Sequence, residues 1–158
     1  MRPWQGGCVL CALLVSGLVS GILSGCATQR GDGLAGPRAD VVLAGLSQVG
    51  TPYVYGGSSP GEGLDCSGLT YYAHHVAGVQ IPRVSTEQLR TATPVPGRQP
   101  RPGDIVFFRI APGEHHVGLM VDEERFVHAS TSRRQVRLDR LATPYWQARY
   151  LGAGTYLD

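Results

Sequence analysis

The amino-acid sequence predicts an α+β domain in which N-terminal helices pack on an antiparallel β-sheet. After residue 37 the apolar residues first follow helical spacing, whereas the last third of the chain holds short segments rich in β-branched and aromatic residues. Helices that precede strands in this way are typical of α+β folds. With 158 residues, the chain is long enough for one domain with its own hydrophobic core.

The first segment, residues 1–25, is predicted to be a lipoprotein signal peptide. Arg2 precedes an apolar, uncharged run at residues 9–23, which is shorter than the roughly 20 residues of a membrane-spanning helix. The run ends in LSGC at residues 23–26, which resembles the lipobox of bacterial lipoproteins. This resemblance implies cleavage before Cys26 and lipidation of Cys26. A transmembrane anchor and an ordinary secreted protein are the alternatives.

The expected mature chain has two parts. Residues 26–37 are polar and glycine-rich, which predicts a flexible tether, and residues 38–158 form the predicted domain. Ala27 follows Cys26, and in a lipoprotein of a two-membrane bacterium the absence of Asp at this position favours the outer membrane. We therefore expect a lipid anchor on Cys26 with the domain facing the periplasm.

Three helices are predicted in the domain. Apolar spacing favours a helix over residues 38–49, and a second helix opens at Cys66 and ends at Gly78. Ser85 with Gln88 three residues later matches a capping box at a small third helix. The glycine- and proline-rich segments 51–65 and 93–103 are expected to be loops.

Four strands are predicted after these helices, over residues 105–110, 116–121, 125–129 and 135–138. They are separated by charged or turn-forming residues, which favours an antiparallel meander. No internal repeat is visible.

Cys66 is the single cysteine of the predicted domain, because Cys8 and Cys11 fall in the predicted signal peptide and Cys26, the expected lipidation site, precedes the domain. A thiol becomes a strong nucleophile as a thiolate, which a helix N-terminus or a protonated histidine stabilises. Asp65 can cap this helix, but its charge opposes thiolate formation, so a partner histidine is needed. The alternative is an inert buried cysteine.

His116 and His128 are the candidate partners. His74 and His75 lie too far along the helix that Cys66 opens to reach its thiol. A three-residue turn at residues 122–124 would pair Gly118 with His128 and place both candidate imidazoles on one face of the sheet, whereas a two-residue turn would separate them. We predict the three-residue turn.

The resulting hypothesis is nucleophilic attack by Cys66 on an amide, with His116 as the base and His128 orienting it. The backbone N–H of Cys66 and the Tyr53 hydroxyl are candidate oxyanion donors. No cofactor or metal is expected.

Five sequence blocks resemble the NlpC family of papain-like cell-wall peptidases, and within it the small Spr-type murein endopeptidase lipoproteins. The blocks are GTPYVYGGSSPGEGLDCSGLT at 50–70, IPRVSTEQ at 81–88, RPGDIVFF at 101–108, HVGLMVD at 116–122 and FVHAS at 126–130. The resemblance implies a papain-like fold with Cys66 as nucleophile, His116 as base and His128 as the orienting residue. It further implies Tyr53 near the oxyanion and Asp65 and Ser67 in the substrate cleft.

The same resemblance implies peptidoglycan as the partner and substrate. Spr-type members hydrolyse the cross-link from D-alanine to meso-diaminopimelate, which we expect here. Other members cut from D-glutamate to diaminopimelate within one stem, and this alternative stays open.

Three further readings compete. The same residues could serve an amidase or acyltransferase, the chain could be a non-catalytic peptidoglycan-binding lipoprotein, or Cys66 and the two histidines could bind zinc, although they lack close-paired ligand spacing. The formal net charge of +2 without a run of like charges gives no indication of nucleic-acid binding. Protein partners are not predicted.

Overall fold

The structure is a computed structural model that describes residues 36–96 and 99–157; the predicted signal peptide and Cys26 lie outside them. The helices are α1 (Pro37–Leu46), α2 (Cys66–Val76), α3 (Ser85–Thr91) and α4 (Pro144–Gln147). The strands are β1 (Ser58–Ser59), β2 (Gly63–Leu64), β3 (Thr93–Pro94), β4 (Ile105–Ala111), β5 (Glu114–Met120), β6 (Arg125–Ser130), β7 (Gln135–Arg140) and β8 (Tyr150–Thr155). Over these described ranges, no helix is long and apolar enough to cross a membrane.

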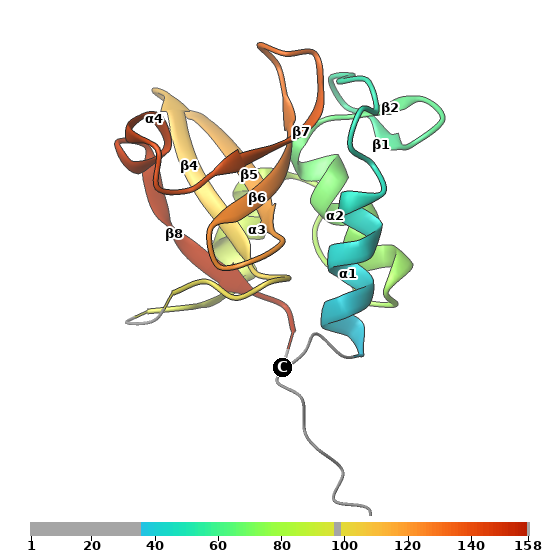
Figure 1. The fold of residues 1–158 in the computed structure, drawn as a ribbon, viewed down its shortest axis with the longest axis horizontal. Coiled ribbons are helices and arrows are strands. Elements are labelled where there is room, and N and C mark those ends of the chain that lie inside the picture. Colours follow the sequence, from blue (N-terminus) through green and yellow to red (C-terminus); the bar gives the residue numbers. More distant parts are fainter. Residues whose placement is uncertain (1–35, 97–98, 158) are drawn as a thin grey trace, which may run out of the picture. The chain divides into compact units, whose positions relative to one another are not determined.

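Six strands form one antiparallel sheet in the order β3-β8-β4-β5-β6-β7, and β1 pairs with β2 separately. Helices α1 and α2 pack against each other and lie together beside this sheet (Figure 1). Their apolar side chains and one face of the sheet share a core. This core includes Val41, Leu69, Leu119, Val127 and Val136. The predicted α+β architecture is confirmed.

The opposite face of the sheet has an aromatic core. Side chains alternate along a strand, so Phe108 and Phe126 point away from α1 and α2. With Val106 and Met120 they pack against Trp146 of α4. His116 and His128 lie on this second face, where Phe108 pairs with His116 across β4 and β5. The site histidines are therefore set into an apolar, aromatic surface.

The predicted elements differ from the observed ones in a few places. The first helix begins at Pro37 and ends at Leu46, three residues earlier than expected. The capping box was wrong: Val84 is the N-cap of α3, and no side chain caps that helix. Gln88 instead points inward and bonds the Thr70 hydroxyl and two backbone carbonyls, which satisfies a fully buried amide.

Five observed elements were not predicted from the sequence: the two-residue strands β1, β2 and β3, which lie in segments expected to be loops, strand β8 and helix α4. Strand β8 has the sequence YLGAGT, in which two glycines replace the β-branched residues that favour a strand. It nevertheless pairs with both β3 and β4, so it belongs to the middle of the sheet. Helix α4 has only four residues and is recognisable by Pro144 at its start.

Candidate active site

Cys66 is the first residue of α2, as predicted, and Asp65 is the N-cap. The Asp65 carboxylate accepts a hydrogen bond of 2.6 Å from the backbone N–H of Gly68. Gly68 must be glycine, because a Cβ at this position would collide with the carbonyl oxygen of Gly57. The DCSG motif thus combines a helix cap, a thiol on the first helical residue and a close approach of the preceding loop.

The thiol of Cys66 has a raised pKa. Burial is the main cause, and the charge of Asp65 adds to it. Hydrogen bonds from backbone groups of Val117 and Ser67 to the sulfur lower the pKa, but they do not offset the rise caused by burial. The thiol is therefore protonated at neutral pH, and it would need a nearby base to accept its proton in order to act as a nucleophile.

The predicted register between β5 and β6 is confirmed. Leu119 pairs with Val127 and Met120 with Phe126, so the turn between them has the expected odd length. The Nε2 atom of His116 consequently lies 2.9 Å from Nδ1 of His128. Both side chains are almost fully buried, with exposed fractions of 5% and 2%.

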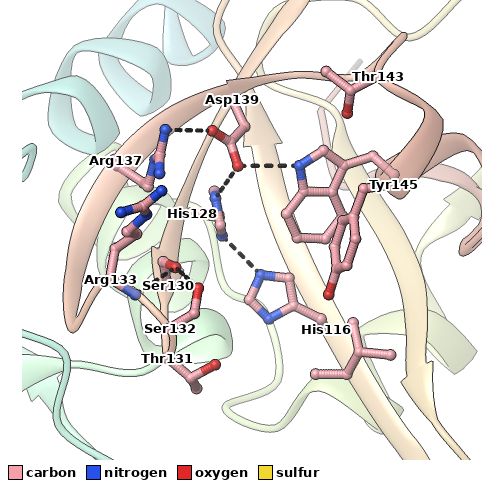
Figure 2. Close-up of a pocket in the computed structure, with 12 residues that line it drawn as sticks. His116, His128, Ser130, Thr131, Ser132, Arg133, Arg137, Asp139, Thr143 and Tyr145 are labelled. Atoms are coloured by element: carbon pink, nitrogen blue, oxygen red, sulfur yellow. Dashed lines mark hydrogen bonds and ion pairs between the residues drawn. The ribbon is translucent and has the colours of Figure 1, made fainter.

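This pair continues into a third and a fourth side chain that the sequence did not reveal. The Nε2 atom of His128 lies 3.1 Å from Oδ2 of Asp139 on β7. The indole Nε1 of Trp146 donates to the same oxygen at 3.0 Å. Figure 2 shows the chain of contacts from His116 through His128 to Asp139.

Burial lowers the pKa of His116 to about 3, and the neighbouring His128 adds to this effect. The charge of Asp139 acts to raise it. The imidazole of His116 is thus neutral at neutral pH, which is the form that can accept a proton. With its Nε2 atom engaged by His128, Nδ1 is the nitrogen left for the thiol.

Cys66 and His116 line one open cavity of about 500 Å³, together with Tyr53, Asp65 and Ser67. All five site residues predicted around this cleft are brought together. The pKa of Tyr53 is raised, mainly by burial and next by Cys66, so its hydroxyl keeps its proton and can donate a hydrogen bond. The third residue predicted for catalysis, His128, contacts His116 and lines with it an adjoining recess of about 350 Å³ (Figure 2).

Arg83 is a further residue of the first cavity that sequence reasoning missed. Its guanidinium donates to both oxygens of Asp65 and to the Ser67 hydroxyl, at 2.8 to 3.0 Å. Its position within the IPRVSTEQ block was the available signal. The polar wall beside Cys66 is therefore a connected network.

The two histidines of α2, His74 and His75, do not line this cavity. His74 is buried and bonds the carbonyl oxygen of Thr70 through Nδ1, whereas His75 is exposed. Within residues 36–96 and 99–157, no group of three or more histidine, cysteine or acidic side chains is arranged to hold a metal ion.

The described geometry coincides with a known family of domains. The model of the NlpC/P60 family matches residues 50–155, which includes every residue of the cleft and of the histidine pair. The chain belongs to the NlpC/P60 family. The sequence resemblance to this family is thereby confirmed.

Two relatives from Escherichia coli K12 illustrate the range of NlpC/P60 proteins. Murein DD-endopeptidase MepH is 39% identical over 113 residues, which cover 68% of this chain and 42% of MepH. Probable endopeptidase NlpC is 33% identical over 150 residues, covering 89% of this chain and 94% of that protein. The chain thus spans less than half the length of MepH and nearly the whole of NlpC.

The fold agrees with solved NlpC/P60 structures. An NlpC/P60 family protein from Bacillus cereus superimposes with a TM-score of 0.70 at 32% sequence identity. The match covers 77% of this chain and 40% of that structure. The catalytic fold is therefore shared, while the larger relatives carry additional sequence outside it.

Proposed function

We propose that this protein is a cysteine endopeptidase that hydrolyses peptidoglycan peptides. The observation that carries the proposal is the joint placement of Cys66 and His116 in one open cleft, with His116 held by His128. A nucleophile, a base and a residue that orients the base are the components of amide hydrolysis through an acyl-enzyme. Membership of the NlpC/P60 family and the murein endopeptidase name of a relative support peptidoglycan as substrate.

In the proposed reaction, Nδ1 of His116 accepts the proton of the Cys66 thiol as sulfur attacks the amide carbonyl. A carbon–sulfur bond forms, and collapse of the tetrahedral intermediate breaks the carbon–nitrogen bond. The amine leaves with the proton from His116. Water, deprotonated by the same imidazole, then hydrolyses the thioester and restores the thiol.

The tetrahedral oxyanion needs donors close to Cys66. The backbone N–H of Cys66, at the start of α2, and the hydroxyl of Tyr53 in the same cavity are the proposed donors. A protonated phenol is required for this role, and the raised pKa of Tyr53, due mainly to burial, meets it. We propose that Asp65 and Ser67, fixed by Arg83, form a substrate-binding wall beside the nucleophile.

The preferred bond is the cross-link from D-alanine to meso-diaminopimelate. The name of MepH as a murein DD-endopeptidase supports this choice, although the match spans less than half of that protein. The bond from D-glutamate to diaminopimelate within one stem is the alternative. The non-catalytic alternative, a peptidoglycan-binding lipoprotein, predicts binding without product.

The experiment is digestion of purified diaminopimelate-type sacculi by the wild-type protein and by Cys66→Ala, with released muropeptides identified by mass spectrometry. We expect cross-linked dimers to become monomers, and the rate to fall at least about 1,000-fold in Cys66→Ala. Truncated stems would move the cut inside one stem. Equal product from both proteins would refute catalysis by Cys66.

A matched histidine pair controls for nonspecific effects of substitution. His116→Ala should lose about 10² to 10⁴ in rate, because it removes the positioned base. His75→Ala removes an exposed imidazole of α2 outside the cleft and should retain wild-type activity. Equal losses in both variants would contradict a specific role for His116.

We also propose that the protein is a lipoprotein of the outer membrane, anchored through Cys26. The LSGC motif and the following Ala27 support this proposal. Metabolic labelling with a palmitate analogue, followed by membrane fractionation, tests it. Label and outer-membrane recovery in the wild type, both lost in Cys26→Ser, are the expected results; an unlabelled wild-type protein would contradict it.

A further inference from the structure

Asp139 links His128 to Trp146, the aromatic side chain that packs against both histidines. Its Oδ2 atom accepts from Nε1 of Trp146 and faces Nε2 of His128, and its Oδ1 atom pairs with Arg137 at 2.9 Å (Figure 2). Trp146 also stacks on His116, with ring centroids 5.5 Å apart and planes inclined by 17°. The carboxylate thus contacts His128, and the indole contacts both imidazoles.

The carboxylate of Asp139 acts only as an acceptor. Partial burial acts to raise its pKa, but hydrogen bonds from His128 and Trp146 outweigh burial and hold the pKa below its usual value. An ionised carboxylate has no proton to donate. The nitrogen of His128 that faces it must therefore carry the hydrogen.

The proton positions of both histidines follow from this constraint. A neutral imidazole has one N–H and one bare nitrogen. In the neutral pair, a His128 with its hydrogen on Nε2 presents a bare Nδ1 to His116, and Nε2 of His116 then donates across the 2.9 Å contact. Nδ1 of His116 is then the bare nitrogen, which is the form that a base needs.

We propose that Asp139 is a positioning residue that sets the tautomers of His128 and His116, so that Nδ1 of His116 is free to accept the proton of Cys66. This inference rests on the proposed function, because it assumes that His116 is the base. The site is then a relay of four residues, Cys66, His116, His128 and Asp139. Only Cys66 and His116 gain or lose a proton during the reaction.

The alternative tautomer explains why such a residue is needed. The two imidazoles, whose planes are inclined by 85°, form an equally good hydrogen bond when His128 donates from Nδ1 and His116 accepts at Nε2. His116 would then carry its proton on Nδ1 and could not accept another from Cys66 without becoming an imidazolium. Loss of tautomer control in a triad of similar logic lowers turnover by about 10⁴-fold.

The direct test is nitrogen NMR of the full-length chain with isotope-labelled histidine, in a Cys66→Ala background that keeps thiolate charge out of the measurement. With Asp139 present, we expect an unprotonated Nδ1 and a protonated Nε2 on His116. Adding Asp139→Leu should move protonation partly onto Nδ1 of His116. Unchanged tautomers after Asp139→Leu would overturn the proposal, whether or not the protein cleaves peptidoglycan.

Kinetics of the same substitutions with Cys66 intact provide the second measurement. Asp139→Leu should lower kcat by about 10² to 10⁴-fold with little change in KM, because substrate contacts are intact. Asp139→Asn should recover part of this loss, since the indole N–H of Trp146 orients the amide oxygen inward as an acceptor for His128. Wild-type kcat in Asp139→Leu, or an Asn variant no better than the Leu variant, would overturn it.

Glu87→Gln is the matched control, because it neutralises an exposed carboxylate on α3 that pairs only with Arg90 among the described residues. It should leave kcat and the histidine tautomers unchanged. If wild-type protein proves inactive on peptidoglycan while the tautomers respond to Asp139 as expected, the proposed function fails and the positioning role of Asp139 stands.

Discussion

Arg83 holds Asp65 by a two-point contact, with Nη1 3.0 Å from Oδ1 and Nη2 2.8 Å from Oδ2. The other nitrogen-borne hydrogens of the same guanidinium reach the Ser67 hydroxyl and the carbonyl oxygen of Gly57. The loop before α2, the helix cap and the segment before α3 are thereby joined beside Cys66. This junction holds Asp65, the N-cap of α2, and Ser67 on either side of Cys66 in the chain.

Arg83→Lys should weaken both folding and catalysis. Lysine lacks the planar fork that contacts both carboxylate oxygens, so at least one charge-assisted hydrogen bond is lost. We expect the free energy of unfolding to fall by about 1 to 3 kcal/mol and KM to rise, as measured by denaturant titration and steady-state kinetics. Arg90→Lys, at an exposed pair with Glu87, should leave both unchanged. Equal effects of the two substitutions would contradict this role for Arg83.

Trp146→Phe separates the stacking of this side chain on His116 from its hydrogen bond to Asp139. Phenylalanine can keep the stack on His116 but cannot donate to Asp139, so kcat should fall on the order of tenfold with a small loss of stability. Trp146→Ala also empties the core formed with Phe108 and Phe126 and should cost about 3 to 5 kcal/mol. Thermal unfolding and kcat together distinguish the two effects; an unchanged kcat in Trp146→Phe would argue against the hydrogen bond.

The pH profile of kcat/KM should have a broad neutral plateau. Burial, with a further contribution from His128, lowers the pKa of His116 to about 3, so the base stays unprotonated far below the ordinary value of 6.5. Burial raises the pKa of Cys66 above its ordinary 9.0, so the opposite limb lies in the alkaline range. An acid limb near 6.5 in the measured profile would show that the proton acceptor is a solvated histidine and not His116.

His74 should make folding sensitive to acid. Burial lowers its pKa to about 4, below the 6.5 of an unfolded chain, so the unfolded state binds the proton first. The contribution of His74 to stability is therefore present above about pH 6.5 and is lost as the pH falls toward 4. Between about pH 7 and about pH 5 this amounts to about 2 kcal/mol.

His74→Leu tests this contribution. Denaturant unfolding at both pH values should show a smaller acid loss than in the wild type, because leucine does not titrate. His75→Leu, at the exposed neighbouring position, should keep the full acid loss. A His74→Leu protein with undiminished acid sensitivity would assign the effect to other groups.

The first part of the site was predictable because local sequence determines it. The DCSG motif specifies a capped helix start, and the three-residue turn at 122–124 determines whether His116 and His128 share a face. Both expectations are confirmed by the structure. Predicting the register of β5 and β6 required only the alternation of side chains along a strand and the length of one turn.

The fourth member of the relay was not predictable in the same way. Asp139 reaches His128 only if β6 and β7 pair with Ser130 opposite Gln135, which leaves four residues in the turn. In that turn Arg134 has a φ of 56°, a conformation that arginine rarely adopts. No sequence pattern indicated this turn. Trp146 is likewise placed by tertiary packing, since α4 is too short to carry a periodic pattern.

The most direct test of the central claim is a single-turnover reaction of a purified cross-linked muropeptide dimer with wild-type protein and with Cys66→Ser. Rapid acid quenching, intact-mass measurement and peptide mapping would follow the acyl-enzyme. We predict a transient adduct equal in mass to the acyl half of the dimer, located on Cys66, followed by monomeric product, with neither formed at a comparable rate by Cys66→Ser. An adduct on another residue, or hydrolysis by Cys66→Ser at the wild-type rate, would contradict the account.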